Sequence, residues 1–149
     1  MKQKFDITVD AGIDVVWAAF TNPDNMGRWV RNFKSFKTTS GEPGQPGATA
    51  EVVFDEKGKA VVLTETVTER REKAFLAGTY ESAHGTAHIV HHFEAVDDHT
   101  TRWASWCSFT FSGVMKLLSI FMGGGIRKRM EGDMARFKLM VESDEASQS

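Results

Sequence analysis

Three histidines lie close together in the segment AHIVHHFE, where imidazoles could bind a metal ion or transfer protons. The alternation of the segment predicts a β-strand, on which His88 and His92 share one face about 13 Å apart while His91 lies on the other. A metal site needs its ligand nitrogens within about 2 Å of one ion. The spacing therefore predicts no metal site, and His91 remains as an imidazole that could act alone in the interior.

Glu65 is the carboxylate that could act together with His91. In the segment around it, the apolar residues Val61, Leu63 and Val67 recur at every second position. This alternation carries Glu65 to the same inward face. A buried carboxylate near an imidazole has a shifted pKa and can exchange protons with a substrate. Alternatively, Glu65 lies at the sheet rim and His91 is a hydrogen-bonded core residue, and a bulge would exchange the two faces.

Two further features suggest chemistry but fit it less well. Cys107 lies within a strand pattern without a basic neighbour to lower its thiol pKa, so it is interpreted as a packing residue. The segment GGGIRKRM resembles a phosphate-binding loop, but no Lys-Ser or Lys-Thr pair follows it. Its cations Arg127, Lys128 and Arg129 would oppose the dipole of the helix that starts there. They are predicted to form a solvated basic collar.

The composition indicates one globular domain. The chain has 149 residues, of which 41% are hydrophobic and 26% charged, and its net charge of −2 does not favour nucleic acid as a partner. The longest apolar segment is about half the ~20 residues of a membrane span. The single cysteine fits a reducing cytoplasm. We expect a cytoplasmic protein without a cofactor, with one domain over residues 1–143 and a disordered polar tail over 144–149.

The elements that position these residues follow from the periodicity of the chain. An alternating strand in KFDITVD is followed by helical spacing in GIDVVWAAF and by a second short helix starting at Asn22. About six alternating strands follow, up to TRWASWCSFTFS, and the rest is helical. This order predicts an α+β fold in which a long antiparallel sheet curls around the final helix. That helix would bury a stripe formed by Ile126, Met130, Met134, Phe137 and Val141.

Several motifs occur in an order typical of one known superfamily, namely Val16–Trp17, Trp29, the segment DDHTTRW and the closing segment RFKLMVE. Through these motifs the chain resembles the helix-grip fold of the START-related SRPBCC superfamily, in particular its polyketide cyclase/dehydrase-like and coenzyme Q-binding-like members. The resemblance implies a curved antiparallel sheet of about seven strands, two short helices after the first strand, and a long C-terminal helix. It also implies an internal cavity for apolar small molecules. The superfamily shares no catalytic set, so the resemblance assigns no catalytic residue.

We therefore expect the protein to bind or transport a small hydrophobic ligand of the polyketide, quinone, sterol or lipid class. Two alternatives stay open, namely a polyketide cyclase or dehydratase without a metal, and a protein-interaction module that uses the apolar segment 114–122. The predicted cavity residues are His91, Phe93, Trp103, Ser105, Phe109, Phe111, Met130, Met134 and Phe137.

The run Gly123–Gly125 interrupts an otherwise helical pattern. Each internal glycine costs a helix about 1 kcal/mol relative to alanine, so the run predicts a break between two helices. The preceding helix would be a lid over the cavity, hinged at Gly123, Gly124 and Gly125 and covering it with Leu117, Leu118 and Phe121. The same apolar segment fits permanent packing or the seam of a homodimer equally well.

Overall fold

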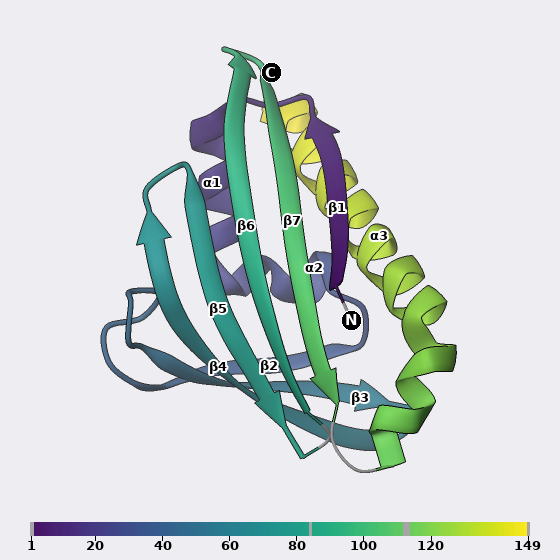
Figure 1. Cartoon of the computed structure of the whole chain (residues 1–149). Helices are drawn as coiled ribbons and strands as arrows, with labels where there is room; N and C mark the ends of the chain where they lie inside the picture. The colour runs from purple at the N-terminus through teal and green to yellow at the C-terminus, as the bar shows by residue number, and fades with distance from the viewer. Residues whose placement is uncertain (1, 84, 112–113, 149) are drawn as a thin grey trace.

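The chain forms one curved antiparallel sheet with a long helix along its open side (Figure 1). The computed structural model describes residues 2–83, 85–111 and 114–148, with side chains from residue 125 onward in the last segment. The elements are β1 (Lys2–Val9), α1 (Ile13–Thr21), the 3-10 helix η1 (Pro23–Asn25), α2 (Met26–Trp29), β2 (Phe33–Ser40), β3 (Thr49–Glu56), β4 (Lys59–Arg71), β5 (Phe75–Ser82), β6 (Gly85–Asp97), β7 (Thr100–Phe111) and α3 (Val114–Gln148).

The sheet has seven strands in the order β1-β7-β6-β5-β4-β3-β2, and every neighbouring pair is antiparallel. The strands bend strongly in Figure 1, so that β2, β3 and β4 turn beneath α3 while β1 lies beside it. A sheet of this length curls because each strand is twisted relative to the next. The α+β helix-grip fold expected from the sequence, with its two short helices after β1, is therefore confirmed.

Local residue choices explain the connections. The β3–β4 hairpin turns at Lys57 and Gly58, both with positive φ (55° and 84°), as a two-residue hairpin of this type requires. The side chain of Asn22 accepts a hydrogen bond from the Asp24 backbone N–H at 3.0 Å and caps η1, whose first residue is Pro23. These caps and turns position the short helices at one end of the curved sheet.

The core lies between the concave face of the sheet and α3. Helix α3 presents Met134, Phe137 and Val141, which are buried to 5%, 0% and 2% exposure. They pack against buried residues of the sheet, among them Val9 of β1 and Trp103 of β7. The apolar stripe predicted for the last helix is thus the surface that the sheet encloses.

The predicted helix break at Gly123–Gly125 is wrong, because α3 is one helix from Val114 to Gln148. A glycine retains its backbone N–H and C=O, so the hydrogen-bond ladder of the helix passes through it. Each glycine costs the helix about 1 kcal/mol, but the helical turns on either side can outweigh this cost. Extending an existing helix is far more favourable than starting a new one. The proposed lid residues Leu117, Leu118 and Phe121 lie outside the part of the chain whose side chains are described.

The C-terminal end of α3 also differs from the expectation of a disordered tail. The helix continues through residues 144–148. Asp144 forms a bidentate ion pair with Arg28 of α2, with N–O distances of 2.8 and 2.9 Å. Ser147 Oγ donates to the Asp144 carbonyl at 2.9 Å. These contacts tie the last turns of the helix to the α2 region.

Candidate ligand-binding site

A cavity of about 650 Å³ lies between the concave face of the sheet and α3. Its wall is mainly apolar and is built by the inward faces of the strands, by residues around α1 and α2, and by α3. Residues that the alternation assigned to the inward strand faces line this cavity. They are Val61, Leu63, Glu65 and Val67 on β4, Ile89 and His91 on β6, and Trp103, Ser105 and Phe109 on β7.

Six of the nine predicted cavity residues line this space, namely His91, Trp103, Ser105, Phe109, Met130 and Met134. Phe111 lies at the end of β7, where its ring stacks on that of Phe109 with centroids 6.1 Å apart.

Phe93 and Phe137 are packed core residues and do not line the cavity, which corrects the prediction. Phe93 is 5% exposed and its ring meets Trp17 of α1 edge-on at 5.4 Å. Phe137 is fully buried, with its ring 5.2 Å from Trp29 and 5.1 Å from Trp103. The periodicity gave the correct faces, but the two short helices and α3 fill this end of the sheet with aromatic rings.

His91 presents a neutral imidazole to the cavity. Its Nδ1 accepts a hydrogen bond from Trp103 Nε1 at 3.1 Å, so in the neutral ring the proton is on Nε2. Burial, with a smaller contribution from His92, lowers the pKa of His91 to about 3. The imidazole is half-buried and lines the cavity. His91 is therefore a hydrogen-bond donor at neutral pH and not a base.

Glu65 pairs with a residue that the sequence analysis did not select, Tyr80. The two face each other in register across β4 and β5 and line the same cavity. Burial raises the pKa of Glu65, and hydrogen bonding from the Tyr80 phenol partly opposes that rise. The pKa of Tyr80 is also raised, first by burial and then by the Glu65 charge. Finding this pair requires the strand register, which alternation within one strand does not give.

The hypothesised catalytic pair of His91 and Glu65 is not brought together. Glu65 is opposite Tyr80, which is opposite Ala87 on β6. Ala87 and His91 are four residues apart on that strand, or about 13 Å. Among the hydrogen bonds of the described residues, none joins Glu65 to His91. The cavity instead has two separate polar positions, with Glu65 and Tyr80 at one and His91 at the other.

Ser105 is the cross-strand neighbour of His91 and is 2% exposed. Its Oγ lies 3.7 Å from the Cys107 Sγ, which in turn lies 3.7 Å from the Met130 Sδ. Burial raises the pKa of the Cys107 thiol to about 11. The thiol stays protonated at neutral pH, which agrees with its interpretation as a packing residue.

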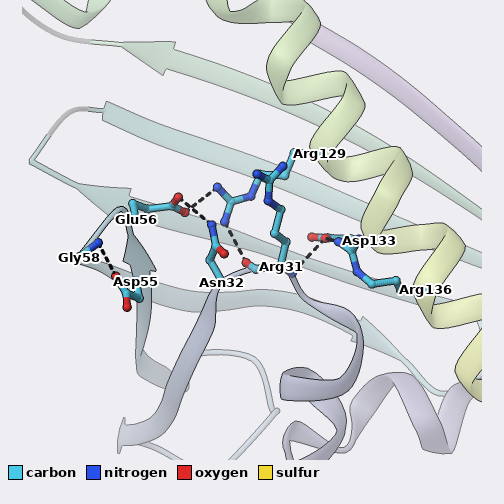
Figure 2. A network of polar contacts seen from close by, with 8 residues as sticks. All are labelled: Arg31, Asn32, Asp55, Glu56, Gly58, Arg129, Asp133 and Arg136. Atoms are coloured by element: carbon cyan, nitrogen blue, oxygen red, sulfur yellow. Dashed lines mark hydrogen bonds and ion pairs between the residues drawn. The ribbon is translucent and has the colours of Figure 1, made fainter.

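A polar network joins α3 to the loop before β2 and to the end of β3, at the rim of the cavity (Figure 2). Arg129 contacts Glu56 with an N–O distance of 2.5 Å and donates to the Arg31 carbonyl at 3.0 Å. Asn32 donates to the same Glu56 carboxylate at 3.0 Å. Arg129 is therefore a contact at the cavity rim. The sequence analysis had predicted that it belongs to a solvated basic collar, and this prediction is wrong for Arg129.

Asp133 continues this network one turn further along α3. It accepts a hydrogen bond from the Arg31 backbone N–H at 3.0 Å and pairs with Arg136. Burial raises the pKa of Asp133, while these two partners oppose the rise.

In the described part of the chain, no group of three or more histidine, cysteine, aspartate or glutamate residues could hold a metal ion. Within the same residues, no helix has the length and apolar character needed to cross a membrane.

The sequence matches a family model described as polyketide cyclase / dehydrase and lipid transport, over residues 2–142. The chain belongs to this family. The match confirms the polyketide cyclase/dehydrase-like membership expected from the sequence, and the fold is the expected helix-grip fold. Among curated proteins, none matches the chain significantly.

Solved structures with low sequence identity share the family fold. The Zhui aromatase/cyclase from a Streptomyces species is 13% identical, with a TM-score of 0.79 over 95% of this chain and 93% of that one. Ara h 8.0201 is 15% identical, with a TM-score of 0.78 over 96% and 98%. A START superfamily protein from Mycobacterium smegmatis is 12% identical, with a TM-score of 0.67 over 88% and 94%. At these identities the likeness concerns the fold alone.

Proposed function

We propose that this member of the polyketide cyclase/dehydrase and lipid transport family binds or carries one small hydrophobic ligand in the cavity beneath α3. The supporting observation is the cavity itself. Its volume of about 650 Å³ lies within the ~300–1,000 Å³ of small-molecule sites, and its wall is apolar with a few inward polar groups. A polyketide, quinone, sterol or lipid of matching size would fit this description.

A titration with the uncharged dye Nile red tests the proposal. The wild-type protein should enhance and blue-shift the dye's fluorescence with saturable binding. Ala87→Phe adds a ring to the cavity wall and should weaken binding at least about tenfold. Thr86→Phe adds the same ring on the exposed outer face of β6 and should leave binding unchanged. The proposal fails if the wild type binds no dye or if both variants bind alike. Native mass spectrometry of the purified protein would reveal a retained natural ligand.

A cyclase or dehydratase activity is the second candidate, favoured by the buried Glu65–Tyr80 pair on the cavity wall. In a dehydration, the Glu65 carboxylate would take a proton from the carbon next to a ketone and return it to the departing hydroxyl as water leaves. The test is the conversion of a β-hydroxy ketone to its enone, followed by absorbance, in wild type and Glu65→Gln. Equal rates in the two proteins would reject this role for Glu65.

Two further expectations stay predictions. An interaction through segment 114–122, including a homodimer, predicts that sedimentation velocity finds a complex that Leu118→Glu abolishes. A cytoplasmic location is consistent with the buried free thiol of Cys107 and is tested by cell fractionation.

A further inference from the structure

We propose that the cavity selects uncharged ligands carrying a carbonyl-type oxygen, with His91 recognising the oxygen and Glu65 disfavouring ligand anions. This inference rests on the proposed binding function and adds the chemical class of the ligand. The cavity wall carries few hydrogen-bond donors and charged groups, and some of them already have partners within the protein. The preferred ligand is inferred from the groups that remain.

The first support is the orientation of His91. Its Nδ1 is occupied by the hydrogen bond from Trp103 Nε1 at 3.1 Å, which leaves the Nε2–H as the free donor of the ring. Within the described residues, no hydrogen bond to Nε2 is found. Phe20 packs edge-on against the imidazole with centroids 4.8 Å apart, and Ser105 is the cross-strand neighbour of His91. A ligand oxygen would satisfy this donor, whereas a hydrocarbon at the same place would leave it unpaired.

The second support is that the arginines at the cavity already have partners. Arg70 Nε contacts Glu72 Oε1 at 2.6 Å, its Nη1 donates to the Gly44 carbonyl at 3.0 Å, and its guanidinium lies over the Trp17 ring. Arg129 is held by Glu56 and the Arg31 carbonyl at the rim. Both arginines that line the cavity are thus already paired with a carboxylate, and among the described side chains no lysine lines it.

The third support is the position of Glu65. Its partner is the Tyr80 phenol, which is uncharged, and both groups belong to the cavity wall. An anionic ligand would have to lie in the same low-polarity space as this carboxylate or force it to take up a proton. Either event weakens binding, because like charges in an apolar site interact strongly. A neutral ketone, quinone or enone meets no such penalty.

Three naphthalenes of nearly equal shape separate these effects: 2-acetonaphthone, 2-isopropenylnaphthalene and 2-naphthoate. The second replaces the ketone oxygen with CH₂, and the third replaces the methyl group with an ionised oxygen. Their affinities are measured at pH 7 by displacement of Nile red. We expect the ketone to bind about three- to tenfold more tightly than the alkene, the range of one hydrogen bond, and at least about tenfold more tightly than naphthoate.

Variants then assign each preference to its residue. His91→Phe should remove the preference for ketone over alkene, while His91→Gln, which can accept from Trp103 and donate to the ligand, should keep part of it. Glu65→Gln should tighten 2-naphthoate several-fold relative to 2-acetonaphthone. Glu69→Gln, an exposed carboxyl on the same strand, should change neither.

The outcomes separate this inference from the proposed function. If Nile red binds but ketone and alkene bind equally, or naphthoate binds as tightly as the ketone, the cavity is a binding site and the selectivity is refuted. If neither Nile red nor any naphthalene binds, the binding function itself fails. Should His91→Phe be unfolded, the three wild-type affinities and the Glu65→Gln comparison still decide the question.

Discussion

Tyr80 lies directly opposite Glu65 in the register of the β5–β4 pair, and both side chains line the cavity, where hydrogen bonding from the phenol lowers the pKa of the carboxyl. Desolvation favours the protonated form of the Glu65 carboxyl group, while the phenol of Tyr80 favours the ionised form of the same carboxyl group. Because the raising effect is the larger, the pKa of Glu65 is above its usual value. Burial therefore sets the direction of the shift in the Glu65 pKa, and the phenol limits its size.

Removal of the phenol oxygen should raise the pKa of Glu65 further. In Tyr80→Phe the carboxylate loses the one side-chain hydrogen bond that lowers its pKa, while its burial is retained. The measurement is a pH titration of the Glu65 side-chain carboxyl ¹³C shift in both proteins, with the exposed Glu69 as the internal reference. The variant should also lose about 1 kcal/mol of unfolding free energy. An unchanged or lower pKa for Glu65 would show that Tyr80 is not its partner.

The low pKa of His91 should make stability depend on pH. The folded protein binds a proton at His91 only below about pH 3, whereas the unfolded chain binds it below about 6.5. Between these values the unfolded state holds more protons, so the contribution of His91 to stability falls as pH decreases from 6.5 towards 3. Its slope is at most about 1.4 kcal/mol per pH unit.

Denaturant unfolding of wild type and His91→Gln from pH 3.5 to 7.5 measures this effect. The difference between the two curves isolates His91 from the carboxylates that titrate in the same range. His88→Gln, on the exposed face of the same strand, should follow the wild-type curve. If His91→Gln retains the full wild-type slope, the imidazole is not held neutral by its surroundings.

The rim network should contribute measurably to the attachment of α3. Arg129→Met removes the ion pair with Glu56 and the hydrogen bond to the Arg31 carbonyl, both visible in Figure 2. Because the pair is half-buried and Asn32 still contacts Glu56, we expect a loss of about 1 kcal/mol in unfolding free energy. Lys128→Met, at the neighbouring exposed position, should change it by less than about 0.5 kcal/mol. Equal effects of the two variants would mean that the network adds no stability.

Alanine should be tolerated in place of glycine in the part of the glycine run that the structure describes in full. A Cβ atom added at Gly125 meets no other atom within 4 Å, so Gly125→Ala should raise the unfolding free energy by about 0.5–1 kcal/mol. At Gly78 of β5, the added Cβ would lie 2.9 Å from the Thr66 carbonyl oxygen, so Gly78→Ala should destabilise the protein. Thermal unfolding followed by circular dichroism compares the two. A destabilising Gly125→Ala would indicate that the helix needs flexibility at this position.

The sequence alone determined the elements and the faces they bury. Alternation placed Glu65, His91 and Ser105 on inward faces, and all three line the cavity. Helical spacing likewise placed Met134 and Phe137 on the stripe that α3 buries. These are local properties, because the direction of a side chain depends on its position within one strand or helix.

The tertiary structure decided which residues meet. Glu65 faces Tyr80, and Arg129 reaches Glu56, because of strand register and the curvature of the sheet. The glycines that predicted a break lie inside a continuous helix. Register, curvature and helix continuity depend on contacts between segments far apart in the chain and on cooperative hydrogen bonding, so neither residue spacing nor single-residue preference reveals them.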